Sequence, residues 1–243
     1  MLQKQIRVAV TASVVLLGAF AFRANGARSA REISNTTAKI VAASASISPS
    51  AAPAALAATD KVTTETVVLA GGCFWGVQAV FQHTRGVISA RSGYAGGQRG
   101  TATYEEVSTG TTGHAEAVKV IFDPSKVTYQ QLLTIFFSVV HDPTELNRQG
   151  PDHGTQYRSE VFTTTPEQKK ATEDFIAALT AKKVYNHPIV TVVAPLNGFF
   201  EAEAYHQDYA TLHPDNMYIA INDLPKVENL RKQFPAQYRA ELK

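Results

Sequence analysis

Apolar residues after position 66 follow strand-like and helix-like patterns in turn. Thr66 to Ala70 is a β-branched apolar run closed by two glycines, which predicts a buried strand entering a tight turn. Cys73 to Gln82 then has apolar residues at helical spacing. The same criteria predict strands at Val87–Tyr94, Glu116–Phe122, Glu160–Thr163 and Ile189–Val193, and helices at Tyr129–Val140, Pro166–Lys182 and, on the surface, Pro225–Lys243. This alternation predicts a single-domain α/β (α+β) two-layer sandwich with a mixed sheet.

The first 27 residues have a different pattern. Lys4 and Arg7 precede Val8–Phe22, a run without charge that is shorter than the roughly 20 residues needed to span a bilayer. A basic start and a short apolar run are typical of an export signal, so residues 1–27 are expected to be a signal peptide. Small residues at 24–27 allow cleavage, while the lack of a clean A-x-A site leaves an uncleaved membrane anchor open. The protein is therefore expected to be exported, either periplasmic or secreted.

Residues 28–65 are expected to be a disordered linker, since from Ser34 onwards they are mostly Ala, Ser, Thr and Pro. The alternative is a helix, because Ala is a good helix former, although Pro49 and Pro53 argue against it. The folded domain is then expected over residues 66–243. Removing the leader leaves 20 basic against 21 acidic residues, a net charge of −1. Nucleic-acid binding therefore has no electrostatic support.

A single cysteine limits the chemistry that the chain can perform. It excludes an internal disulfide and any site with several thiolate ligands. Cys73 follows two glycines at a predicted helix start, where unpaired N–H groups and the helix dipole favour the thiolate. A lone cysteine is otherwise most often a small buried apolar residue. Two long polar stretches, 94–114 and 141–158, interrupt the pattern and are predicted to be functional loops.

The residues Gly71 to Gly76 (GGCFWG) resemble the active-site motif of the A-type peptide methionine sulfoxide reductases. The resemblance continues in order over nearly the whole folded part, from Val67 to about Pro214. The further matching blocks are 94–97 (YAGG), 103–107 (TYEEV), 113–118 (GHAEAV), 141–144 (HDPT), 152–159 (DHGTQYRS), 202–203 (AE) and 206–209 (HQDY).

The resemblance implies reduction of methionine-S-sulfoxide, free or in oxidised proteins, on a two-layer fold of ferredoxin-like character without metal or organic cofactor. It implies that Cys73 attacks the sulfoxide sulfur and becomes a sulfenic acid, and that Glu116 protonates the oxygen. The remaining site residues that it implies are Tyr104 and Tyr157 at the oxygen, Asp152 near the recycling step, and Gly72, Phe74, Trp75 and His206 around the substrate. An acid kept neutral by burial suits this chemistry, because a sulfoxide oxygen leaves poorly until it is protonated.

The C-terminal tail departs from many relatives because residues 216–243 contain no cysteine. Regeneration is therefore expected to depend on an external thiol, either glutathione or a thioredoxin-like protein. In an oxidising compartment this thiol needs its own supply of electrons. A monomer is assumed, since no feature of the sequence indicates an assembly.

Three other functions remain open at this stage. A cysteine hydrolase would use His114 or His153 as its base. A metal site could form from His141, Asp142, Asp152 and His153. A binding module would use Trp75 and the tyrosines as a contact surface, and its affinity would survive loss of the Cys73 thiol.

Overall fold

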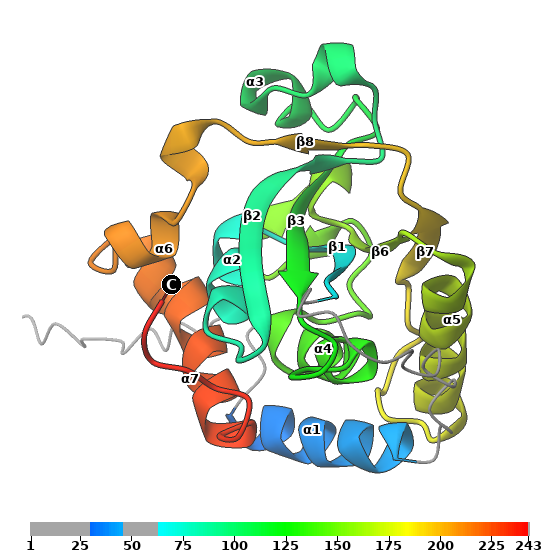
Figure 1. Cartoon of the computed structure of the whole chain (residues 1–243). Coiled ribbons are helices and arrows are strands. Elements are labelled where there is room, and N and C mark those ends of the chain that lie inside the picture. Colours follow the sequence, from blue (N-terminus) through cyan, green and yellow to red (C-terminus); the bar gives the residue numbers. More distant parts are fainter. Residues whose placement is uncertain (1–29, 46–62, 243) are drawn as a thin grey trace, which may run out of the picture.

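The structure is a computed structural model that describes residues 30–45 and 63–242. Its centre is a six-stranded sheet with the strand order β7-β6-β1-β3-β2-β8, visible in the middle of Figure 1. The strands are β1 (Glu65–Gly71), β2 (Val87–Ala95), β3 (Ala115–Phe122), β6 (Ser159–Thr163), β7 (Val192–Pro195) and β8 (Phe199–Glu201). The parallel pair β6–β7 makes the sheet mixed, as the sequence predicts.

Four strands and two helices form a ferredoxin-like core. The chain order is β1, α2 (Phe74–Gln82), β2, β3, α4 (Tyr129–Ile135) and β6, and the sheet order β6-β1-β3-β2 is antiparallel throughout. Strand β1 therefore lies in the interior of the sheet between β6 and β3. The end of β1, where the chain turns into α2, is held on both sides. The expected fold class is confirmed.

The two faces of the sheet are covered differently. A large core of aliphatic and aromatic residues, including Phe81, Phe122 and Phe137, lies between one face and the helices. The other face carries a smaller cluster around Val68, Ala117 and Phe162, and the β7–β8 segment packs over it. Burial on both sides explains the near-continuous apolar run of β1.

Local capping fixes two helix starts. Thr128 and Gln131 form a reciprocal capping box at α4, with the Thr128 side chain accepting from the Gln131 backbone N–H. Helix α5 (Pro166–Ala181) has proline in its first turn and Thr165 as its cap. Both starts agree with those predicted from the sequence.

Three predicted boundaries were wrong. The C-terminal helix predicted at Pro225–Lys243 ends at Gln233, because Gln237 and Arg239 bond instead to the backbone of Arg85 and His83. The α-helix from Tyr129 ends at Ile135 and continues as a π-helical turn, η2 (Phe136–Val140), so the wider turn carries the last part of the predicted helix. The strand predicted at Ile189–Val193 begins instead at Val192 and extends to Pro195, because its partners Glu160 to Thr163 on β6 fix the register there.

The predicted disordered linker is wrong for its first part. Residues Ala30–Ser44 form helix α1, with Ile40 and Ala43 fully buried. Figure 1 shows α1 across one end of the molecule, where it packs against α4, α5, η2 and α7 (Leu224–Gln233). Tertiary burial of its apolar side thus outweighs the weak local signal. The rest of the linker (46–62) and the predicted signal peptide or anchor (1–27) lie outside the described residues.

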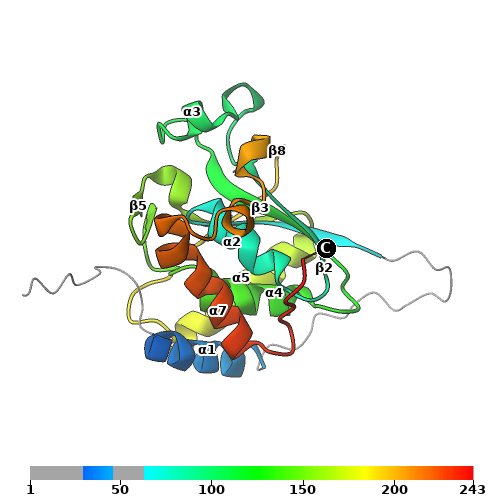
Figure 2. The same ribbon diagram turned by 90° about the vertical axis from the view of Figure 1, so that its left-hand side faces the viewer.

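Short elements complete the chain. They are η1 (Arg99–Thr101), α3 (Tyr104–Val107), β4 (Arg148–Gln149), β5 (Asp152–His153), η3 (Thr155–Tyr157), η4 (Ala204–His206), α6 (Tyr209–Leu212) and the π-helical η5 (Ile219–Asp223). Viewed from the side in Figure 2, α3 and β8 lie at the opposite end of the molecule from α1. Over the residues that the structure describes, no helix has the length and apolar character needed to cross a membrane.

Candidate active site

Cys73 lies in the connection between β1 and α2. Gly72 has φ +90°, and a Cβ there would lie 2.7 Å from the Gln149 side chain, so the sharp approach to Cys73 requires glycine. Cys73 itself is the residue before the first turn of α2 and is 8% exposed. Gly72 thus shapes the turn that presents the sulfur at the helix start.

The ionisation of Cys73 differs from the sequence-based prediction. Burial raises the pKa of the thiol well above its usual value, and the carboxylates of Glu116 and Asp223 raise it further. The backbone N–H of Trp75 and the ammonium of Lys226 lower it only in part. The prediction that the helix start alone favours the thiolate was wrong, because the cost of burying a charge exceeds the effect of one helix terminus.

Glu116 on β3 points to the same helix start. It is 4% exposed, and its Oε2 accepts a hydrogen bond from the backbone N–H of Phe74 at 3.0 Å. Burial raises the pKa of Glu116 to about 8, and the N–H of Phe74 partly opposes this shift. The carboxyl next to the sulfur is therefore mainly protonated at neutral pH and can serve as an acid.

Aromatic rings form a wall beside the sulfur. The indole of Trp75 stacks on Tyr209, with ring centroids 3.9 Å apart and planes 12° from parallel. The ring of His206 lies 5.0 Å from that of Phe74 and 4.6 Å from that of Tyr104. Such a wall offers contacts that suit a methyl group on sulfur.

The tautomer of His206 follows from its partners. The Trp75 indole Nε1–H donates to His206 Nδ1 at 3.2 Å, so Nδ1 carries no proton. Burial lowers the pKa of His206, which keeps the ring neutral and places its proton on Nε2. Among the described residues, the buried Nε2 has no hydrogen-bond partner. It is a free donor in the aromatic wall.

Tyr104 is placed by Glu203. One carboxylate oxygen of Glu203 accepts from the Tyr104 backbone N–H at 2.9 Å, and the other accepts from the Tyr94 hydroxyl at 2.8 Å. The ring of Tyr104 rests on His206 and remains partly exposed. Glu203 therefore ties α3 to the segment that carries His206.

Tyr157 and Asp152 lie on the loop side of the site. Burial raises the pKa of Tyr157, and the charges of Glu116, Asp152 and Cys73 raise it further, which places its hydroxyl among these groups. Burial also raises the pKa of Asp152, although the Tyr218 hydroxyl, which donates to Asp152 Oδ2, opposes the shift. Both tyrosine hydroxyls remain neutral donors.

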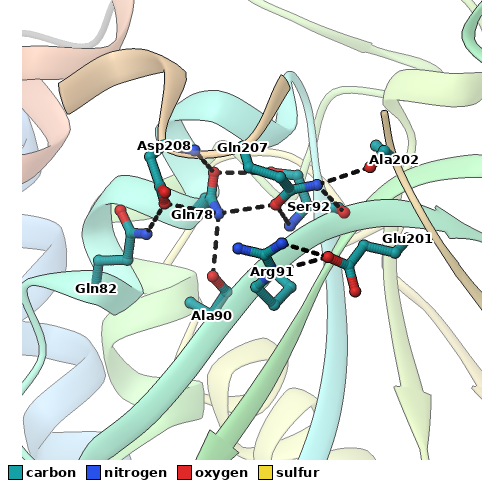
Figure 3. Close-up of polar contacts among 9 residues, drawn as sticks. All are labelled: Gln78, Gln82, Ala90, Arg91, Ser92, Glu201, Ala202, Gln207 and Asp208. Carbon is teal, nitrogen blue, oxygen red and sulfur yellow. Dashed lines mark hydrogen bonds and ion pairs between the residues drawn. The ribbon is translucent and has the colours of Figure 1, made fainter. Parts of the chain in front are cut away.

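A buried hydrogen-bond network holds the segment that contains His206 (Figure 3). The Gln78 side chain on α2 donates to Ala90 O at 3.0 Å and to Gln207 Oε1 at 3.2 Å. Gln207 in turn donates to Ser92 O at 2.9 Å. The network joins α2, β2 and residues 202–208, so side-chain hydrogen bonds fix an irregular segment against the helix and the sheet.

The structure brings together all the predicted site residues, and it adds others. Four additional groups lie at the site or directly beside it: Glu203, Tyr209, Tyr218 and the pair Asp223–Lys226. Glu203 and Tyr209 belong to blocks that the family resemblance covers. Tyr218, Asp223 and Lys226 come from the tail, where a predicted surface helix gave no sign that the chain returns to the cysteine.

Two histidines of the alternative functions, His114 and His141, are hydrogen-bonded away from the sulfur, and the third is exposed. The two ring nitrogens of His114 contact the Gly97 N–H and the Gln98 carbonyl, and those of His141 contact Phe136 O and Ser159 Oγ. His153 is exposed. Within residues 30–45 and 63–242, no group of three or more His, Cys, Asp or Glu side chains is placed to hold a metal ion.

The fold and the site define a class of protein: a ferredoxin-like α/β domain with one buried cysteine at a helix start, facing a neutral carboxyl and an aromatic wall. The family model described as peptide methionine sulfoxide reductase matches residues 65–238. Peptide methionine sulfoxide reductase MsrA 2 of Mesorhizobium japonicum is 56% identical over 174 residues, which are 72% of this chain and 89% of the relative.

Two solved structures support the same family assignment. Mxr1 from Saccharomyces cerevisiae in its reduced form has a TM-score of 0.60 at 33% identity, covering 65% of this chain and 90% of that one. Methionine sulfoxide reductase A of Corynebacterium diphtheriae has a TM-score of 0.55 at 36% identity, covering 64% and 77%. The chain belongs to the peptide methionine sulfoxide reductase family, A type. It is an enzyme that reduces methionine sulfoxide.

Proposed function

We propose that the enzyme reduces the S epimer of methionine sulfoxide, free and in oxidised proteins, with Cys73 as nucleophile and Glu116 as acid. The observation that carries this proposal is the placement of a protonated carboxyl at the helix start that holds the only cysteine. The Cys73 thiolate attacks the sulfoxide sulfur while Glu116 donates its proton to the oxygen and becomes a carboxylate. The protonated oxygen passes to Cys73 as a sulfenic acid, and methionine leaves with the electron pair of the broken S–O bond.

The surrounding groups have distinct roles in this proposal. The hydroxyls of Tyr104 and Tyr157 donate to the sulfoxide oxygen without adding charge near the sulfur. Phe74 and Trp75 contact the S-methyl group, and the free Nε2–H of His206 is a further donor to the substrate. Asp152, held by Tyr218, serves the later recycling step.

An external thiol completes the cycle in this proposal. One external thiol condenses with the sulfenic acid to give a mixed disulfide and water. A second external thiol then attacks this mixed disulfide, which restores the Cys73 thiol and yields the disulfide of the external thiol. Support comes from the single cysteine, which leaves no second thiol in the chain. A glutathione-type thiol or a thioredoxin-like protein fits this role. We further propose that the protein is exported, on the sequence of its first 27 residues.

The test is a single turnover without reductant. Reduced protein receives one equivalent of methionine-S-sulfoxide and then dimedone, and its intact mass and released methionine are measured. We expect one dimedone adduct on Cys73, an equal amount of methionine, and no reaction with the R epimer. The Cys73→Ser variant is the matched control and should release none. Intact sulfoxide with the parent protein would reject the proposal.

A further inference from the structure

A buried ion pair lies beside the reactive cysteine and has no role in the function proposed above. Asp223, at the end of η5, is completely buried. Its Oδ1 accepts from the Lys226 ammonium at 3.0 Å, and the Lys226 side chain is 20% exposed. The second oxygen of Asp223, Oδ2, has no hydrogen-bond partner among the described residues.

The pair packs directly on the first turn of α2. A Cβ built on Gly76, three residues after Cys73, would lie 2.1 Å from Asp223 Oδ1 and 2.8 Å from Lys226 Nζ. Glycine at this position therefore leaves the space that the two charges occupy. Both charged groups thus reach the helix turn that carries the sulfur.

Stability alone does not account for such a pair. A buried ion pair loses about as much free energy by desolvation as it gains by attraction, and apolar residues of similar size are often as stable. Here one carboxylate oxygen also stays without a partner. A charge kept at this cost next to a reactive group indicates a role in the chemistry of that group.

The thiolate of Cys73 needs a nearby cation. The sulfur is buried, and two acidic groups disfavour its charge, Glu116 on β3 and Asp223 on η5. Asp152 on β5 acts on Glu116 and accepts from the Tyr218 hydroxyl. Tyr104, Tyr157 and Tyr218 face the site as hydroxyls. Among the described residues, Lys226 is the cation whose charge lowers the pKa of Cys73. Burial alone would lower the pKa of Lys226, but its interactions with Asp223, Cys73 and Asp152 together raise it, so its ammonium keeps its charge.

We propose that Lys226, held against the first turn of α2 by Asp223, is a positioning residue that stabilises the Cys73 thiolate. It thereby determines how much nucleophile exists at neutral pH. The proposal rests on the proposed function only in taking Cys73 as the nucleophile. Asp223 has two opposed effects: it holds the ammonium in place, and its own negative charge disfavours the thiolate.

The test measures the ionisation of Cys73 in the full chain without any sulfoxide. Iodoacetamide is uncharged and reports only on Cys73, since the chain has no other cysteine. Alkylation rates between pH 6 and 11 follow the thiolate fraction and yield the apparent pKa, which lies above the usual value in the parent. In Lys226→Met we expect this pKa to rise by about one unit, so that alkylation near pH 7 slows about tenfold. Lys226→Arg should retain most of the parental rate.

Two further variants separate electrostatics from structure. Asp223→Asn removes a negative charge but keeps a side-chain oxygen that can accept from the Lys226 ammonium. We therefore expect a lower apparent pKa of Cys73 and faster alkylation, opposite to Lys226→Met. A purely structural pair predicts changes in the same direction for both variants. Lys232→Met is the matched control, because Lys232 lies on the same helix, is 59% exposed and contacts Glu228. It should behave as the parent.

Thiolate absorbance at 240 nm, with Cys73→Ser as the baseline, distinguishes altered ionisation from altered access. A folded Lys226→Met protein with the parental absorbance titration would overturn the inference. Failure of the proposed function has a different result, namely a parent that ionises Cys73 normally and leaves the sulfoxide intact.

Discussion

At the scale of single residues, the site combines two groups whose burial is unfavourable for folding and useful for the proposed reaction. Glu116 holds a proton that an exposed carboxyl would have lost, and the pKa of Cys73 is raised for the same reason. A buried neutral acid next to a buried thiol is what transfer of an oxygen from sulfur to sulfur requires. The free-energy cost of burying these groups should be measurable as a loss of folding stability.

Glu116→Gln is expected to remove a pH dependence of folding. The folded protein keeps the Glu116 proton up to about pH 8, while an unfolded Glu loses it near pH 4.5. Between these values the unfolded state binds fewer protons, so this group lowers stability as pH rises. The difference in free energy of unfolding between the variant and the parent should therefore increase in favour of the variant by about 1.4 kcal/mol for each pH unit in this window.

Urea unfolding at pH 5, 7 and 9 measures this difference. Glu105→Gln, which makes the same substitution at an exposed position, is the control. Parallel stability curves for the parent and Glu116→Gln would contradict the expectation. The variant should also lose most of the single-turnover rate, because an amide cannot donate the proton.

His206→Phe is expected to weaken substrate binding more than the chemical step. Phenylalanine keeps the ring contacts with Phe74 and Tyr104 but removes the free Nε2–H and the acceptor of the Trp75 indole. Loss of one substrate hydrogen bond is worth about 1 kcal/mol, so KM should rise about fivefold while kcat changes less. Steady-state kinetics with a small-thiol reductant check this. A fall in kcat at constant KM would assign His206 to the chemistry instead.

At the scale of elements, two segments behave differently from their local sequence patterns. Helix α1 precedes the region matched by the family model and packs on α4, α5 and α7. The start of α7 brings Lys226 to α2, although its charged composition is typical of a surface helix. In both cases the decisive contacts are distant in sequence, and a local pattern does not contain them.

Ile40→Ala is expected to release α1 and leave the catalytic domain folded. Ile40 is fully buried, and truncation of such a residue costs about 2–5 kcal/mol. A 15-residue helix has little stability without its packing. Amide exchange should speed up in α1 and stay slow in β1 and β3. Val41→Ala, on the same helix with Val41 45% exposed, is the control, and equal exchange in the two variants would contradict the role of burial.

At the scale of the whole molecule, residues far apart in the chain converge on the end of β1. The network around Gln78 ties α2 to residues 207 and 208, about 130 positions later in the chain (Figure 3). Glu203 joins the same segment to α3 and β2. The site is therefore assembled by the complete domain.

Gln78→Leu is expected to lower stability and to raise KM together. The change leaves the buried Ser92 and the partly buried Asp208 without their bonds to Gln78, at about 1–3 kcal/mol for each unpaired buried group. It also loosens the segment that carries His206. Thermal unfolding and steady-state kinetics measure both effects. Gln82→Leu removes one bond to Asp208 from a partly exposed residue and should do less. An unchanged KM in Gln78→Leu would show that the network does not influence substrate binding at the site.

The sequence alone determined the order of the main strands and helices from β1 to β7, the fold class and the motif around Cys73. Local periodicity and glycine placement encode these features, because they depend on neighbouring residues. The roles predicted for the individual site residues stay predictions, although the structure brings these residues together.

Only the tertiary structure decided the charge state of the site, the position of α1 and the return of Asp223 and Lys226 to the cysteine. Burial and electrostatics depend on which distant residues surround a group, and a linear pattern does not specify that environment. For this reason the helix start predicted a thiolate at Cys73, while the packed domain holds a thiol whose ionisation depends on its neighbours.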